Sequence, residues 1–269
     1  MYLTAAGYAL CMLLLLSGTL TAHALTDGQL TEILAAFNAD AHFPLPELDA
    51  AARARLQGGE VVKLVNPHPD GTIQVAGVVI IQEPHHAVWL ASQDPHFASP
   101  GQATELRLEL TGDRASWYGY LDLPRPFTDR HWVVNVWNNH ALAARSDNAL
   151  WEHPWTLDET GADTVMPYLA SGQVDGITEE MAQEALYTPV NRGGWVFLAL
   201  PDGSTLLSYH ATSVVGGNIP DRMVAEFIRM GLEDLLRRAE RIAAEVVPGH
   251  YTAGHPAILG GDGQPVPLY

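Results

Sequence analysis

The residues in this chain best placed to do chemistry are an adjacent acid and base, Asp129 and Arg130, at the start of an aromatic strand. Pro124 and Pro126 precede them and are compatible with neither helix nor central ladder pairing, so they mark a stiff corner at the entrance to a sheet. A guanidinium at this point could orient a mostly apolar ligand. It could equally be structural and be held in a salt bridge by Asp129, or by Asp122 across the corner. Both interpretations remain open at this stage.

Aromatic and apolar side chains surround this pair in the sequence. Strand alternation places Trp132 and Val134 on the same face as Arg130. Tyr118 and Tyr120 share one face of the preceding strand, and a buried Tyr hydroxyl bonds either to a ligand or to a backbone carbonyl. Each further candidate is either a ligand contact or ordinary core packing, and methionine adapts well to varied apolar shapes. These candidates are Trp195, Tyr209, Met223, Phe227 and Met230.

Signatures of enzymes and metal sites are absent from the sequence. There is no GxSxG elbow, no phosphate-cradling loop and no dinucleotide fingerprint, so we predict no catalytic residue and no cofactor. The 12 histidines invite a metal hypothesis, but His85 and His86 are adjacent and diverge on a helix. His250 and His255 lie near the C-terminus, and no HExxH or similar spacing occurs. We therefore predict no metal site.

Charge restricts the partners that the chain can bind. Lys and Arg number 14 against 31 Asp and Glu, which gives a formal net charge of −17. Such a surface repels phosphate backbones, so nucleic acid is not an expected partner. It also repels anionic membranes, so any lipid contact is expected to be transient and to depend on apolar burial. The hydrophobic content of 47% is enough for a sizeable core. We expect the protein to be a monomer.

The first 24 residues are typical of an export signal. TAAGYALCMLLLLSG is uncharged and apolar, and TAHA ends with small residues at the positions of a cleavage site. An uncleaved anchor is the alternative, but Gly18, Thr19 and Thr21 weaken the distal half as a spanning segment, so we favour cleavage. Cys11 is the only cysteine, so the mature chain would have none. The expected location is periplasmic or secreted.

Hydrophobic periodicity predicts an α+β order of elements. A helical segment spans 25–55, and a long amphipathic helix follows Pro220 and ends at Pro248. We expect its inner stripe to comprise Val224, Phe227, Ile228, Gly231, Leu235, Ile242 and Val246. A short helix covers 83–95. Strands are expected at 61–65, 72–82, 103–113, 114–123, 129–137, 149–157, 193–200 and 205–214.

Two segments do not fit this predicted order of helices and strands. Residues 158–188 look like an insertion with one possible helix near 178–186, and long loops of this kind are often lids or binding loops. Residues 248–269 are rich in Gly and Pro, so we expect a loosely ordered tail.

Four stretches together resemble the START-like superfamily, the lipid-transfer domains with a helix-grip fold. They are VAGVVIIQEPHHAVWLASQDP, SWYGYLDLPRPFTDRHWVV, GGWVFLALPDGSTLLSYHATSVV and GGNIPDRMV. The resemblance implies a ligand-binding domain over 56–247, a curved antiparallel sheet around the C-terminal helix, and an internal hydrophobic cavity. It also implies that Arg130 faces the cavity. The insertion, the N-terminal helices and His131, where the family often has a second acid, depart from the pattern.

These observations suggest an exported START-like protein that binds a lipid or other hydrophobic small molecule and carries it through an aqueous compartment. A cyclase or hydrolase acting on a hydrophobic substrate in the same fold is the alternative, and it predicts a reactive polar pair deep in the cavity. A third hypothesis is an interaction module whose cavity has closed, which predicts an apolar patch on the exposed 158–188 insertion.

Overall fold

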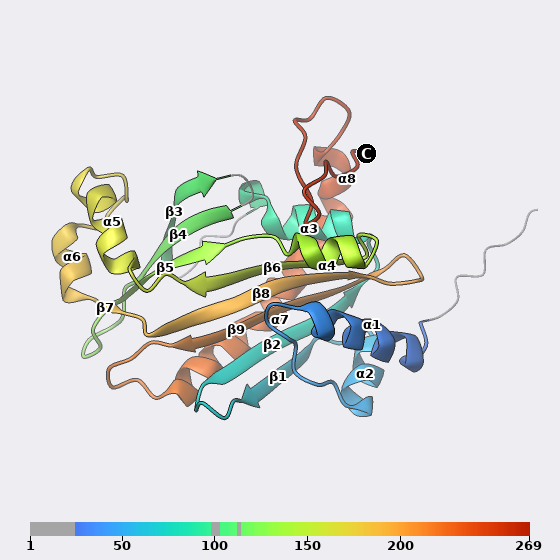
Figure 1. The fold of residues 1–269 in the computed structure, drawn as a ribbon, viewed down its shortest axis with the longest axis horizontal. Coiled ribbons are helices and arrows are strands. Elements are labelled where there is room, and N and C mark those ends of the chain that lie inside the picture. Colours follow the sequence, from blue (N-terminus) through green and yellow to red (C-terminus); the bar gives the residue numbers. More distant parts are fainter. Residues whose placement is uncertain (1–24, 98–102, 112–113) are drawn as a thin grey trace, which may run out of the picture.

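A curved antiparallel sheet with one long helix across its concave face dominates the fold (Figure 1). The computed structural model describes residues 25–97, 103–111 and 114–269. The predicted signal peptide, residues 1–24, lies outside the described residues. Within them eight of the nine strands follow the order β1-β2-β9-β8-β6-β5-β4-β3, and the ninth, β7, pairs in parallel with β5. This is the helix-grip α+β arrangement expected from the sequence, and that prediction is confirmed.

The strands match the predicted segments closely because apolar alternation and tight turns specify them. Pairs of consecutive strands form antiparallel hairpins at β1–β2, β3–β4 and β8–β9. The bounds are β1 Val62–Pro67, β2 Ile73–Ile81, β3 Ala103–Thr111, β4 Arg114–Leu121, β5 Arg130–Val136, β6 Leu150–Leu157, β7 Leu186–Tyr187, β8 Val190–Ala199 and β9 Thr205–Val214.

The long helix α7, Asp221–Glu245, packs on β1, β2 and β9. Its buried residues are Ala225, Leu232, Leu236, Ala239 and Ala243. The predicted stripe was therefore wrong by a rotation of the helix, because three alanines, with Leu232 and Leu236, form the buried face instead of the larger residues expected. Gly77 on β2 permits this packing, since a Cβ there would lie 2.9 Å from the Leu236 side chain.

The C-terminal residues pack against the short helices beside α7. Helix α3, His85–Gln93, and the 3-10 turn η1, Pro95–Phe97, lie next to α8, Val247–His250. Tyr251 is fully buried and its hydroxyl donates to Asp94. The Trp89 indole donates to the Leu259 carbonyl at 3.0 Å. Contrary to the expected loose tail, residues 251–269 fold back on the domain, because glycines at 260 and 261 fit closely over the Trp151 ring.

The convex face of the sheet is covered by the N-terminal helices. α1, Asp27–Asp40, and α2, Ala50–Gln57, bury their apolar residues against β2 and β8, together with α4, His140–Arg145. The carboxylate of Glu152 on β6, itself fully buried, accepts the backbone N–H groups of His42 at 2.8 Å and Phe43 at 3.0 Å. This carboxylate fastens the connection between α1 and α2 to the sheet.

The predicted insertion folds over the outer surface of β4 and β5. It contains α5, Gly161–Ala170, and α6, Glu179–Glu184, of which only the second was expected. Val165 and Leu169 of α5 share a buried cluster with Tyr118 and Val133. The apolar side chains of the insertion are therefore largely buried rather than gathered in an exposed patch.

Among the described residues, no helix combines the length and apolarity that crossing a membrane requires.

Candidate ligand-binding cavity

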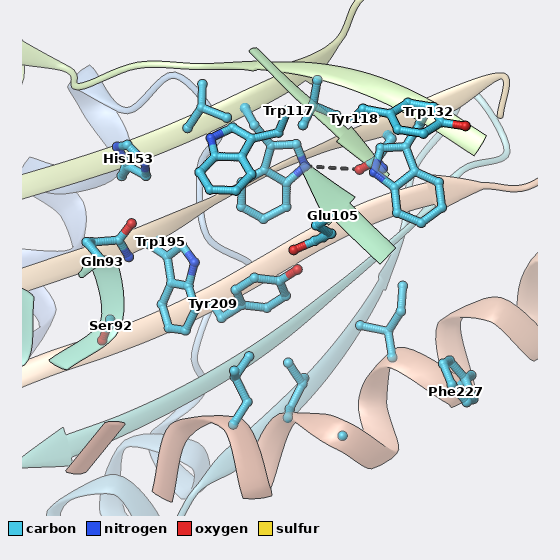
Figure 2. A pocket seen from close by; sticks show the side chains of 18 of the residues that line it. Ser92, Gln93, Glu105, Trp117, Tyr118, Trp132, His153, Trp195, Tyr209 and Phe227 are labelled. Atoms are coloured by element: carbon cyan, nitrogen blue, oxygen red, sulfur yellow. Dashed lines mark hydrogen bonds between the residues drawn. The ribbon is translucent and has the colours of Figure 1, made fainter. Parts of the chain in front are cut away.

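A cavity of about 930 Å³ lies between the concave face of the sheet and the helices α3 and α7 (Figure 2). This volume is in the range of small-molecule sites, which are concave and mostly apolar. Polar side chains gather at one end, at His153, Gln93 and Ser92, and Trp132 and Phe227 lie at the other. The lining residues are Ser92, Gln93, Asp94, Glu105, Trp117, Tyr118, Trp132, Val134, Val136, His153, Trp155, Asn191, Trp195, Tyr209, Phe227, Ile228, Met230, Gly231, Leu232 and Leu235.

Aromatic rings form most of the wall on the sheet side. Four of the seven tryptophans of the chain, at positions 117, 132, 155 and 195, line the cavity. The Tyr209 ring lies 4.8 Å from the ring of Trp195 and 5.3 Å from that of Trp155, between centroids. Rigid rings present a large apolar area at little entropic cost when a ligand binds.

Strand pairing explains how these rings reach the same space. On β5, alternation directs Trp132, Val134 and Val136 to the concave face. Gly119 on β4 pairs with Trp132, and a Cβ at Gly119 would lie only 2.3 Å from the Trp132 indole. The missing side chain at position 119 therefore provides the space in which the indole lies.

Few polar groups interrupt this wall. The Asn191 amide oxygen accepts the Trp155 indole N–H at 3.0 Å, and the His153 ring nitrogen Nδ1 lies 2.6 Å from the amide oxygen of Asn138. None of the described lining residues is Lys or Arg. Desolvation by the surrounding protein raises the pKa of the Glu105 carboxyl, although the residue is exposed. Burial, and secondarily the charge of Glu105, raise the pKa of the Tyr209 hydroxyl.

The cavity includes most, but not all, of the residues that the sequence predicted. Trp132, Val134, Trp195, Tyr209, Phe227 and Met230 line it, as does Tyr118. The Tyr118 ring, however, belongs to the buried cluster under α5 on the outer face. Tyr120 belongs to that cluster too, and its hydroxyl donates to Asp129 at 2.7 Å. Met223 is exposed on α7, outside the lining.

Arg130 also lies outside the cavity lining. Its side chain is only 2% exposed, and its guanidinium donates to the carbonyls of Val215 at 2.6 Å and Gly216 at 2.9 Å. Two further carbonyls, those of Thr128 and Asp129, accept from the same guanidinium. The structure therefore places Arg130 as a tie between β5 and the junction of β9 with α7. Backbone carbonyls hold it, rather than the carboxylates considered from the sequence.

Several lining residues escaped the sequence prediction. Trp117 lies on the opposite face of β4 from Tyr118, and the prediction from the sequence assigned the cavity to the face of the tyrosines. Gly119, between the two tyrosines, was the available signal. It shares the face of Trp117 and leaves room there for Trp132 on the paired strand. Trp155, Glu105 and Gln93 had no comparable signal, since only the assembled sheet and α3 bring them to the cavity.

Histidines gather away from the cavity without forming a metal site. The rings of His96 and His250 stack at 4.4 Å, and His255 lies 5.3 Å from His250. In the part of the chain that the structure describes, no group of three or more His, Cys, Asp or Glu residues could hold a metal ion.

Solved structures similar to this one include START-type lipid-transfer domains. Human StAR-related lipid transfer protein 5 aligns with a TM-score of 0.48 and 14% identity, over 80% of this chain and 97% of that protein. A STAR-related lipid transfer protein from Xanthomonas axonopodis gives 0.46 and 16%, over 68% and 99%. An aromatase/cyclase from a Streptomyces species gives 0.40 and 14%, over 64% and 96%.

These similarities concern the fold alone. The START-like resemblance noted in the sequence recurs in them. No protein-family model matches the chain, and no curated protein sequence matches it.

Proposed function

We propose that this protein binds a hydrophobic small molecule, such as a lipid, in the cavity between the sheet and α7, and carries it through an aqueous compartment. The observation that carries the proposal is the cavity of about 930 Å³ walled by four tryptophans. A packed core would not leave such a space. Each buried methylene of a ligand would add about 0.8 kcal/mol to its retention, so no covalent step is needed.

The exposed apolar residues of α7 support transfer as well as storage. Phe227 and Met230 line the cavity, yet their side chains are 52% and 59% exposed, so they lie at its mouth. Met223 continues this exposed row. Transient contact of these residues with a membrane would let a ligand pass into the cavity without crossing water, while the net charge of −17 keeps the carrier soluble between contacts. We further propose export to the periplasm or the medium.

The alternative functions have less support from the geometry. A cyclase or hydrolase needs a paired acid and base, whereas Trp155 and Asn191, two lining side chains joined by a hydrogen bond, do not titrate. An interaction module needs an apolar insertion surface, and Val165, Leu169 and Val174 of the insertion are buried.

Quenching of tryptophan emission tests the proposal. A brominated long-chain alcohol should quench emission saturably, since bromine acts only at short range. Trp117→Phe should reduce the quenched part of the signal, whereas Trp137→Phe, which alters a tryptophan outside the cavity lining, should leave it intact. Quenching that rises linearly without saturation, and equally in both variants, would contradict the proposal.

A further inference from the structure

Gln93 gives the cavity a hydrogen-bond donor that the protein leaves unused. It is the last residue of α3 and lies at the polar end of the cavity, beside His153 and Ser92 (Figure 2). Its side-chain nitrogen Nε2 is buried and has no hydrogen-bond partner among the described residues. The neighbouring Ser92 hydroxyl, in contrast, already donates to the Val88 carbonyl at 2.8 Å. The carboxylate of Asp94 accepts the Tyr251 hydroxyl.

A buried amide donor without a partner is costly, and native proteins rarely retain one. Gln93 could have been any apolar residue if its role were only to close an apolar wall. Since the amide faces the cavity, its natural partner is an acceptor atom on the molecule that enters. An amphiphile would then bind in one orientation, with its polar atom at Gln93 and its apolar body along the tryptophans.

The charges around the cavity restrict which acceptor this can be. The lining holds two acidic side chains, Asp94 next to Gln93 and Glu105, which is also exposed to solvent, and none of its described residues is Lys or Arg. Arg107, on the same strand as Glu105, is exposed and outside the lining. A carboxylate or phosphate would therefore lose its hydration and meet like charge without a Lys or Arg to compensate. A neutral oxygen meets no charge repulsion, and its smaller desolvation cost is offset by the hydrogen bond from Gln93.

We infer that the cavity selects apolar molecules that carry one neutral oxygen acceptor, a carbonyl or a hydroxyl, and that Gln93 donates to this oxygen. The inference rests on the proposed function and names the ligand chemistry of the same site. It makes Gln93 a specificity-determining residue rather than a catalytic one.

Competition measurements separate this inference from the proposed function. Four competitors of equal chain length, namely an alkane, an alcohol, a methyl ketone and a carboxylate, would displace the brominated alcohol from the wild-type chain. We expect the ketone and the alcohol to bind about tenfold tighter than the alkane, because they satisfy the buried donor. The carboxylate should bind more weakly than either.

Gln93→Leu should remove the advantage of the ketone over the alkane while leaving alkane binding in place. Gln57→Leu is the matched control, since Gln57 ends α2, lies outside the cavity lining and already donates to the Leu25 carbonyl, so this variant should keep the wild-type ranking. If Gln93→Leu does not fold, Gln93→Met serves the same purpose. Equal affinity of alkane and ketone for the wild type overturns the inference alone, as does an unchanged ranking in Gln93→Leu. Failure of all four compounds to bind overturns the proposed function as well.

Discussion

At the scale of single residues, the cavity depends on positions where a side chain is missing as much as on those where one is present. Gly119 and Trp132 pair across β4 and β5, and the indole occupies the space that a Cβ would need. His210 and Arg130 represent the opposite case, since each is a polar side chain almost completely buried. Substitutions of Gly119, Arg130 and His210 therefore have different expected effects.

Gly119→Ala should destabilise the protein by about 1–3 kcal/mol, because the new methyl group displaces the Trp132 indole into the cavity. Binding of the brominated alcohol should weaken in parallel. Urea unfolding and probe titration measure the two effects. Gly28→Ala is the control, because no atom lies within 4 Å of its added Cβ. Equal stability of the two variants would contradict this view of the Trp132 site.

Arg130→Met should cost about 3 kcal/mol or more in urea unfolding, because four backbone carbonyls lose a charged donor. The folded fraction should bind the brominated alcohol with unchanged affinity, since the guanidinium lies outside the lining. Normal stability together with lost binding would instead return Arg130 to the role that the family resemblance implied.

Because of His210, we expect the free energy of unfolding to fall in acid. Burial lowers the pKa of its imidazole to about 3, and neither ring nitrogen has a partner among the described residues. Below the unfolded pKa of about 6.5 the unfolded chain takes up a proton that the folded chain refuses, so stability falls with pH until the folded pKa is reached. His210 alone should contribute a loss of about 2 kcal/mol between pH 7.5 and pH 5.

Urea unfolding at these two pH values measures the effect. His210→Leu should reduce the difference by about that amount. Burial also lowers the pKa of His85, to about 4, so a smaller dependence on pH should remain in the variant. An identical pH dependence in both proteins would show that His210 accepts its proton in the folded state.

At the scale of elements, α7 combines two surfaces. The helix packs on the sheet through its buried alanines together with Leu232 and Leu236. The residues that face the cavity include Phe227, Ile228 and Gly231. Gly231 lies in the interior of α7, where a glycine lowers the stability of a helix. No close packing requires a glycine at this position, since nothing lies within 4 Å of an added Cβ. The open space beside it belongs to the cavity.

Gly231→Ala should therefore raise the free energy of unfolding by about 0.5–1 kcal/mol through helix propensity alone. Thermal unfolding checks this. Gly77→Ala, in which the Cβ would meet Leu232 and Leu236, should have the opposite effect because α7 is pushed off the sheet. A loss of stability in Gly231→Ala would mean that α7 packs more tightly at this point than the structure shows.

Much of the element order could be predicted from the sequence, whereas the site could be predicted only in part. Hairpins such as β8–β9 follow from local alternation and turn residues, which act over short distances. The buried face of α7 could not be deduced, because its three alanines are less hydrophobic than Phe227, which the structure leaves exposed. Helix α5 was missed because Pro167 lies inside it. Glu105 and Gln93 come together only through long-range pairing, which no local pattern encodes.

At the scale of the whole molecule, the two faces of the sheet have separate tasks. Helices α1, α2, α5 and α6 cover the convex face and supply stability through buried clusters. Helices α3 and α7 lie over the concave face, with α8 packed against both, and there the aromatic side chains remain around an open space. This asymmetry leads us to expect a carrier, because buried clusters fill the convex side of the sheet while an open space remains on the concave side.

Native mass spectrometry tests this claim most directly. The full chain would be expressed, purified without detergent, incubated with phospholipid vesicles and separated from them before its mass is measured. We predict a second species heavier by one small molecule, and a loss of that species in Gly231→Trp, whose indole would project into the open space beside α7. A single mass for the apo-protein, unchanged after incubation and identical in ligand content to Gly231→Trp, would contradict the proposal that the cavity carries a hydrophobic ligand.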